Sequence, residues 1–145
     1  MHEKIVKFLE SQTSATICGV DGDGMPFCFS CFFAFDRKKN LLYFKSSAEA
    51  WHSKMMTQKP ILAGTVLPDK LSKLAVKGIQ FSGMLLQEDE AWVSSATHIY
   101  YKKFPVARAI SGQLWAVRPD HIRFTDSTLG FGKKLIYSRP VELRA

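Results

Sequence analysis

Residues 15–45, ATICGVDGDGMPFCFSCFFAFDRKKNLLYFK, contain three apolar runs that are separated by two short turn sequences. The first turn, DGDG at residues 21–24, is typical of a β-hairpin, because glycine and aspartate tolerate positive φ. The second turn, DRKKN at residues 36–40, leads into the third run. We therefore predict three consecutive antiparallel strands, over Ala15–Val20, Phe27–Phe35 and Leu41–Lys45.

Three helices are expected outside these strands. Apolar residues at helical spacing indicate a short amphipathic helix over residues 3–11. Ser46 and Ser47 are favourable N-cap residues, which predicts a second helix that runs to about Thr57. A third helix is expected over residues 88–103, because acidic residues at its start and lysines at its end both complement the helix dipole.

The remaining apolar segments indicate more strands. They are Ile61–Leu67, Leu74–Leu86, Leu114–Val117, His121–Phe124 and Lys134–Tyr137. Strands in hairpin order without regular β-α-β alternation favour an antiparallel barrel over a doubly wound sheet. We expect a mainly β fold, a barrel of about six to seven strands with flanking helices. At 145 residues, the chain is expected to form one domain over residues 1–145.

The composition is that of an ordinary globular protein. Apolar residues make up 46% of the chain and charged residues 23%, which is enough for a packed core. No run approaches the ~18 apolar residues that span a bilayer, and the first residues do not resemble a signal peptide. A cytoplasmic protein without a membrane partner is expected. Three cysteines give no disulfide framework, which agrees with a reducing compartment.

The net charge of +7 raises the question of nucleic-acid binding. The basic residues are scattered along the chain, however, and no recognition-helix, zinc-finger or RNA-binding signature organises them. A pocket for a phosphorylated small molecule explains the charge equally well, so a nucleic-acid partner is not favoured.

Other motifs in the sequence do not support metal or nucleophilic chemistry. Cys28 and Cys31 form a CxxC motif, but residues three apart on a strand point to opposite faces, so the two thiols are not expected to converge. Buried structural cysteines are predicted instead. The four histidines show no metal-ligand spacing, and no serine or cysteine lies in a nucleophile elbow. A hydrolase or a metalloenzyme is therefore poorly supported.

A phosphate site is predicted after the third strand. Lys45, Ser46 and Ser47 are expected where a strand ends and a helix begins, and free backbone N–H groups at such a point favour an anion. His52 follows about one helical turn later and is available to the same anion. The alternative is that Ser47 only caps the helix and that His52 is an ordinary surface residue.

Several features resemble the pyridoxamine 5′-phosphate oxidase-like FMN-binding split barrels. They are the order of turns, the Phe44–Ser47 junction, the helix that ends near Pro60 and the stretch Val117–Phe124. Phe104–Arg108 and Thr125–Lys134 look like a small bacterial branch of that superfamily. The resemblance covers nearly the whole chain. It implies a split β-barrel, a homodimer, and FMN bound in the cleft between subunits.

The resemblance also implies which residues bind the cofactor. The implied FMN-binding residues are Phe44, Lys45, Ser46, Ser47, Trp51, His52 and Lys134. His52 stands where a phosphate-binding lysine is common, and Lys134 falls on an arginine that contacts the flavin in the oxidase. Trp51 stands where an arginine is common, and Ala50 stands where the oxidase has a serine. Two phosphate contacts of the family are thus weakened here.

The segment that binds substrate in the oxidase is different in this chain. The oxidase has an Arg-Leu-His segment, whereas the matching stretch is Gly130-Phe131-Gly132. The vitamin B6 oxidase reaction is therefore not expected. We expect an FMN-binding protein; an FMN-dependent oxidoreductase that acts on a small molecule is the hypothesis for its activity, with no catalytic side chain assigned. The alternatives are a non-catalytic flavin or haem binder or sensor, and a basic nucleic-acid-binding barrel.

Overall fold

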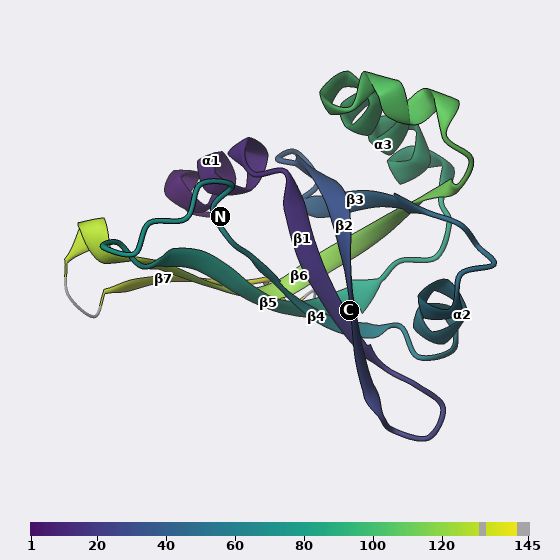
Figure 1. Ribbon diagram of the computed structural model, residues 1–145, viewed down its shortest axis with the longest axis horizontal. Helices are drawn as coiled ribbons and strands as arrows, with labels where there is room; N and C mark the ends of the chain where they lie inside the picture. The colour runs from purple at the N-terminus through teal and green to yellow at the C-terminus, as the bar shows by residue number, and fades with distance from the viewer. Residues whose placement is uncertain (131–132, 142–145) are drawn as a thin grey trace.

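The computed structural model describes residues 1–130 and 133–141 as one antiparallel sheet with helices packed around it (Figure 1). The strands are β1 (Ser14–Val20), β2 (Pro26–Asp36), β3 (Leu41–Ser46), β4 (Ile61–Val66), β5 (Lys77–Leu85), β6 (Gln113–Asp126) and β7 (Lys134–Ser138). The helices are α1 (Glu3–Ser11), α2 (Trp51–Gln58) and α3 (Glu90–Lys103), with short 3₁₀ segments η1 (Pro105–Ala109) and η2 (Ser127–Leu129).

The sheet closes into a barrel. Its strand order is β3-β2-β1-β4-β5-β6-β7, and β3 also pairs with β6, so that six strands form a closed ring and β7 extends it along β6. All of the pairings are antiparallel. The prediction of a mainly β antiparallel barrel of about six to seven strands with flanking helices is confirmed.

The expectation of two short strands after residue 113 is wrong, because β6 is one strand of 14 residues. A β-bulge keeps it continuous: Ser82 pairs with His121 and Gly83 with Pro119, so that Asp120 is the extra residue. A β-carbon at Gly83 would collide with the Arg118 carbonyl, so glycine is needed at this crossing. The bulge lets β6 pair with β3 at one end and with β7 at the other.

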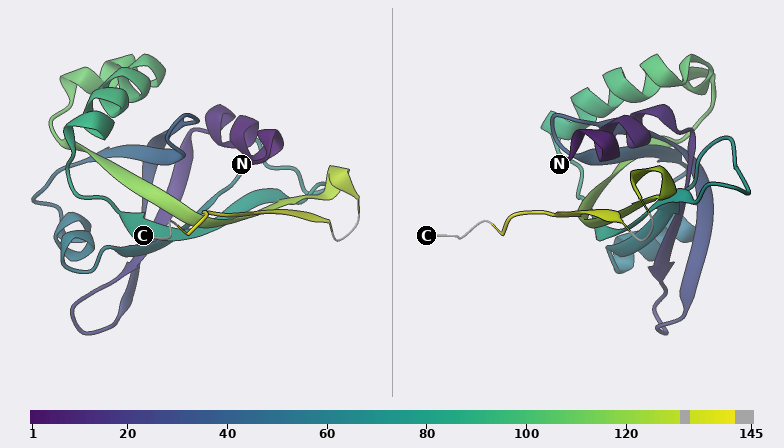
Figure 2. Two further views of the ribbon diagram at one scale, coloured as in Figure 1. Left: turned by 180° about the vertical axis from the view of Figure 1, so that it is seen from behind. Right: turned by 90° about the vertical axis from the view of Figure 1, so that its left-hand side faces the viewer.

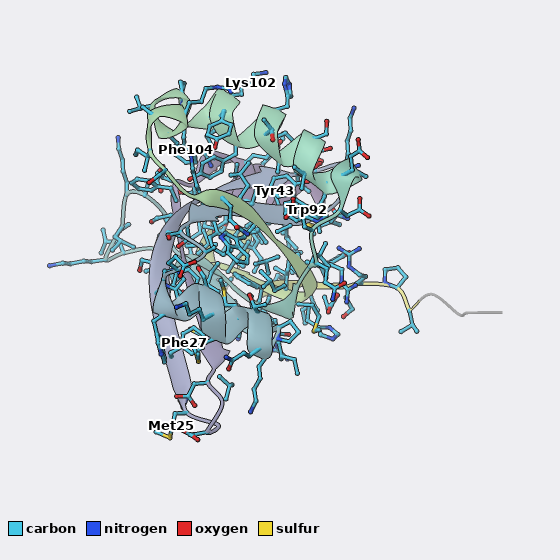
Figure 3. All side chains as sticks on the ribbon, turned by 90° about the vertical axis from the view of Figure 1, so that its right-hand side faces the viewer. Met25, Phe27, Tyr43, Trp92, Lys102 and Phe104 are labelled. Atoms are coloured by element: carbon cyan, nitrogen blue, oxygen red, sulfur yellow. The ribbon has the colours of Figure 1, made fainter. Side chains whose placement is uncertain are left out.

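Two groups of buried side chains hold the fold together. The barrel interior contains the larger one, which includes Ile5, Phe8 and Leu9 of α1. The second lies outside the barrel, where α3 covers β3 and its neighbours. There the Trp92 and Tyr43 rings stack with their centroids 6.1 Å apart (Figure 3). Both helices therefore bury apolar faces, as their sequences predict.

The second helix begins later than predicted. α2 starts at Trp51, and its N-cap is Ala50, which makes no side-chain capping bond. Ser46 still pairs with Gln113 in the sheet, and the Oγ atom of Ser47 accepts a hydrogen bond from the Glu49 N–H within a turn. The prediction that these serines cap the helix is therefore wrong. Pairing with β6 keeps the backbone extended past the point where local preferences favour a helix.

Candidate functional site

A cavity of about 290 Å³ lies beside the barrel, lined by residues of β2, β3, α2, α3 and the η1 segment. Three of the predicted site residues line it: Lys45, Ser46 and His52. Phe29 and Phe32 of β2 also line this space. We call it the Lys45 cavity. The structure thus brings together a cation, a hydroxyl and an imidazole that the sequence analysis placed in one site.

Ser46 and His52 meet because the chain turns back between β3 and α2. Ser46 Oγ lies 2.7 Å from His52 Nε2, a hydrogen-bonding distance. The His52 ring stacks on Phe29, with centroids 4.0 Å apart and planes at 13°. Burial lowers the pKa of His52 from its ordinary value of 6.5, which favours the neutral ring near pH 7. Ser46 and His52 therefore form an uncharged hydrogen-bonded pair beside the cavity.

Lys45 supplies positive charge on the other side. Its Nζ donates a hydrogen bond of 2.7 Å to the carbonyl of Ala107 and lies 5.0 Å from the centre of the Tyr101 ring. The guanidinium of Arg108 lies 4.7 Å from the same ring. A lysine ammonium has three donors, so the bond to Ala107 leaves donors for a ligand. Lys45 also anchors η1 against β3, which fixes this wall of the cavity.

The other predicted site residues do not line this cavity. Phe44 is fully buried in the barrel interior, and Ser47 is exposed in the turn before α2. Trp51 is 55% exposed and contacts Phe27 edge-on, with ring centroids 5.1 Å apart. Lys134 begins β7, which lies on the far side of the molecule from α2 (Figures 1 and 2).

The segment expected at the substrate position, Gly130-Phe131-Gly132, lies partly outside the described residues, since these exclude 131 and 132. Within the described ranges, no group of three or more His, Cys, Asp or Glu side chains is arranged to hold a metal ion. No helix in the described part of the chain is long and apolar enough to cross a membrane.

A larger cleft, of about 820 Å³, lies between α3 and the β2–β3 turn. The sequence pattern of that turn indicates only a connection between strands and does not predict this α3 cleft. Its lining contains six basic side chains: Arg37, Lys38, Lys39, His98, Lys102 and Lys103. Arg37 is paired with Glu3 and Glu10, and Lys103 donates to the backbone carbonyls of Gln12 and Phe33. No local sequence pattern indicates this cleft, because it forms between α3 and a turn that are far apart in the sequence.

The cysteines differ from their predicted burial. Cys28 is exposed, while Cys18 and Cys31 are half-buried, and all three are free thiols. Cys28 and Cys31 do lie on opposite faces of β2, as the strand period predicts, because Cys31 packs against the barrel core. Cys18 is the partner that sequence analysis missed, since it lies directly opposite Cys28 across the hairpin. The near-symmetric spacing of the two cysteines about the DGDG turn was the available signal.

Comparison with known proteins gives clear relatives in sequence. No model of a known protein family matches the chain. A UPF0306 protein of Cronobacter sakazakii is 38% identical over 137 residues, which covers 94% of each chain. The UPF0306 protein YhbP of Escherichia coli O157:H7 is 36% identical over 135 residues and covers 93% of this chain and 91% of its own.

Solved structures with the same architecture are much more distant in sequence. A heme-binding protein from Mycobacterium smegmatis has a TM-score of 0.77 at 13% identity over 90% of this chain, which spans about half (55%) of that protein. A FAD-binding protein from Mesorhizobium loti has a TM-score of 0.66 at 12% identity, covering 84% of this chain and 91% of its own. An F420 reductase has a TM-score of 0.61 at 16% identity, with 80% and 93% covered. These likenesses confirm the predicted split-barrel fold.

Proposed function

The chain belongs to the UPF0306 family, and we propose that it binds FMN in the Lys45 cavity, as a homodimer, and acts as a flavin-dependent oxidoreductase on a small molecule. One observation carries the proposal: Lys45, Ser46 and His52 gather on a single cavity that also presents an aromatic ring. Flavin-binding and reductase activities among proteins of the same fold support it, by analogy of architecture.

The polar residues suit the phosphate of FMN. A lysine ammonium and a serine hydroxyl form charge-assisted hydrogen bonds with a phosphate, which are about twice as strong as neutral ones. The His52 ring is held by Ser46 and by its stack on Phe29, so it offers a ring nitrogen from a fixed position. We assign the phosphate to Lys45 and Ser46, with His52 beside it.

The apolar residues suit a flavin ring and a second subunit. The volume of the cavity, about 290 Å³, is just below the ~300–1,000 Å³ usual for ligand pockets. Phe32, Val106 and Ile110, which lie on or near its rim, are 60%, 79% and 61% exposed. A second copy packed against this rim deepens the cavity and removes these side chains from water. In that arrangement Lys134 comes to the flavin from the partner copy, since within one chain β7 is far from α2.

When bound, FMN would supply hydride transfer with a small-molecule substrate. The residues of the chain hold the phosphate, orient the ring and exclude water. We assign to Lys134 the role of a cation near the flavin, where its positive charge would favour reduction of the cofactor. Because the Arg-Leu-His segment of the vitamin B6 oxidase is absent from the sequence, we propose a substrate other than pyridoxamine phosphate.

Haem is the second candidate ligand. A structural neighbour with a TM-score of 0.77 is a heme-binding protein. His52 is the one histidine on the Lys45 cavity, and its lowered pKa keeps the ring nitrogen available to a metal. A haem site in this place requires the Ser46 hydroxyl to release His52, whereas an FMN phosphate site uses both groups as they stand. FMN is therefore preferred.

Absorption spectroscopy and ligand titration test the proposal. The purified protein is freed of bound cofactor and titrated with FMN and, separately, with hemin. We expect saturable quenching of FMN fluorescence at micromolar or tighter affinity, and reduction of the bound flavin by NADH or NADPH followed by reoxidation with an acceptor. FMN binding without turnover would indicate that the protein is a flavin carrier or sensor and not an enzyme. A Soret band on hemin addition, with no response to FMN, would select haem.

A further inference from the structure

Two thiols face each other on the outer surface of the β1–β2 hairpin. Cys18 and Cys28 are directly paired in the strand register, and their Sγ atoms lie 2.7 Å apart. The hairpin lies at the end of the barrel marked by Met25 in Figure 3. Because Asp21 and Met25 are joined by a backbone hydrogen bond and such bonds alternate along an antiparallel pair, Cys18 and Cys28 form a non-hydrogen-bonded pair.

That type of pair suits a disulfide. Its Cα atoms are ~4.5 Å apart, which lies within the ~4.4–6.8 Å range found for cystines. The two side chains already point toward each other on the same face of the sheet. A bond between them therefore requires only that the two sulfur atoms move closer together, and the strand register stays as it is.

The three thiols differ in their access to an oxidant. Cys28 is exposed, so a small peroxide reaches its sulfur from solvent. Burial, together with the neighbouring Cys28 thiol, raises the pKa of Cys18 to about 11. Burial also raises the pKa of Cys31 to about 12, and its side chain packs against the core on the opposite face. Cys28 is thus the thiol that reacts first, and Cys18 is the one placed to resolve it.

We propose that Cys18 and Cys28 form a redox-active thiol pair that is oxidised by hydroperoxides to an intramolecular disulfide. The Cys28 thiolate attacks one oxygen of hydrogen peroxide, the O–O bond breaks, and a sulfenic acid and one water are formed. The Cys18 sulfur then attacks the Cys28 sulfur, and the S–O bond breaks with loss of a second water. In total, the two thiols lose two electrons and two protons, and one peroxide becomes two waters.

The pair is placed to influence the Lys45 cavity. Phe27 and Phe29 flank Cys28 on β2 and face the opposite side of the strand, where they contact Trp51 and His52 of α2. A disulfide across the hairpin restrains the strand that carries both rings. The oxidation itself does not depend on the proposed cofactor, so the two proposals fail or succeed separately.

Thiol counting tests this inference. The full-length protein, fully reduced and then desalted, is treated with a small excess of hydrogen peroxide. We expect its three free thiols to fall to one, its intact mass to drop by two hydrogen atoms without formation of a dimer, and dithiothreitol to restore all three thiols. Peptide mapping without reduction is expected to join Cys18 to Cys28. The Cys31→Ser variant is the matched control and should lose both of its remaining thiols.

Single variants separate the two roles. In Cys18→Ser, the sulfenic acid on Cys28 has no resolving partner within reach, so it accumulates and is trapped by dimedone. In Cys28→Ser, both remaining thiols are expected to survive the same peroxide dose. Cys28 is exposed, so this variant is expected to fold, which a urea unfolding curve checks. Retention of three thiols by the natural sequence, a disulfide that includes Cys31, or a disulfide only between chains would overturn the proposal.

Discussion

The Lys45 cavity and the α3 cleft differ in size and in the state of their charges. The α3 cleft is larger, about 820 Å³ against about 290 Å³, and has more basic side chains. Its Arg37 is neutralised by two glutamates, and its Lys103 is used by backbone carbonyls. The Lys45 cavity has fewer charges, but they lie beside a hydroxyl, an imidazole and an aromatic ring. We therefore propose the Lys45 cavity as the ligand site, because different polar groups converge there beside an apolar wall.

The largest expected effect concerns the wall behind the Lys45 cavity. Phe44 is fully buried and stacks with Trp115 inside the barrel. We expect Phe44→Ala to lower the free energy of unfolding by about 3–5 kcal/mol, the usual range for a buried phenylalanine. Phe32→Ala is the control, since Phe32 is 60% exposed and should cost much less. Urea unfolding measures both. Equal losses would mean that Phe44 does not belong to the core.

A matched pair of lysine variants compares the two cavities directly. Lys45→Met keeps the aliphatic stem but removes the donors, and it is expected to weaken FMN binding about 10- to 100-fold, since hydrogen bonds to charged groups contribute about 1.5–3 kcal/mol. Lys102→Met makes the same change in the α3 cleft, where Lys102 is exposed on α3 (Figure 3). We expect it to leave FMN affinity unchanged. A larger loss in Lys102→Met than in Lys45→Met would move the site to the α3 cleft.

Neighbouring serines give a smaller contrast. Ser46 lines the Lys45 cavity and contacts His52, whereas the Ser47 hydroxyl faces solvent in the turn. We expect Ser46→Ala to weaken FMN binding about 2- to 10-fold, less than Lys45→Met, because the hydroxyl carries no charge of its own and already has a hydrogen-bond partner in His52 when FMN is absent. Ser47→Ala should bind FMN as well as the natural sequence does. Fluorescence titration decides between them, and equal affinity in all three proteins would remove Ser46 from the site.

The smallest expected effect is a pH dependence of stability. Burial holds the pKa of His52 below its ordinary value of 6.5, so the unfolded chain binds this proton more readily than the folded one. The contribution of His52 to stability is therefore present above about pH 6.5 and decreases as the pH falls toward the lower folded pKa. Between pH 7.5 and pH 5.5, the urea midpoint of unfolding should decrease more in the natural sequence than in the His52→Asn variant. Parallel changes in both proteins would argue against a desolvated His52.

Local sequence signals predicted the parts of the fold that depend on neighbouring residues. The DGDG turn forms the hairpin between β1 and β2, and Asp89 caps α3 by accepting a hydrogen bond from the Ala91 N–H. The continuity of β6 was missed because Pro119 indicates a break, and only the distant Gly83 makes room for it. The start of α2 was also missed because it depends on a residue that is distant in sequence: pairing of Ser46 with Gln113 keeps the backbone extended.

The candidate site was predictable only where its residues are close in sequence. Lys45, Ser46 and His52 share one short segment, and they meet in the structure. Their neighbours Phe29 and Ala107 come from other elements, and no local pattern indicates those contacts. The thiol pair and the α3 cleft likewise depend on strand register and on helix packing. Apart from the β1–β2 hairpin, which the DGDG turn indicates, pairing across the sheet is the information that the sequence patterns do not contain.

A crystal structure of the protein with FMN would test the central claim most directly. We expect the FMN phosphate within hydrogen-bonding distance of Lys45 Nζ and Ser46 Oγ, with the flavin ring against the rim formed by Phe32 and Ile110. We also expect a second copy of the chain to cover that rim. FMN bound in the α3 cleft, or a Lys45 cavity that stays empty at saturating FMN in solution, would contradict the assignment.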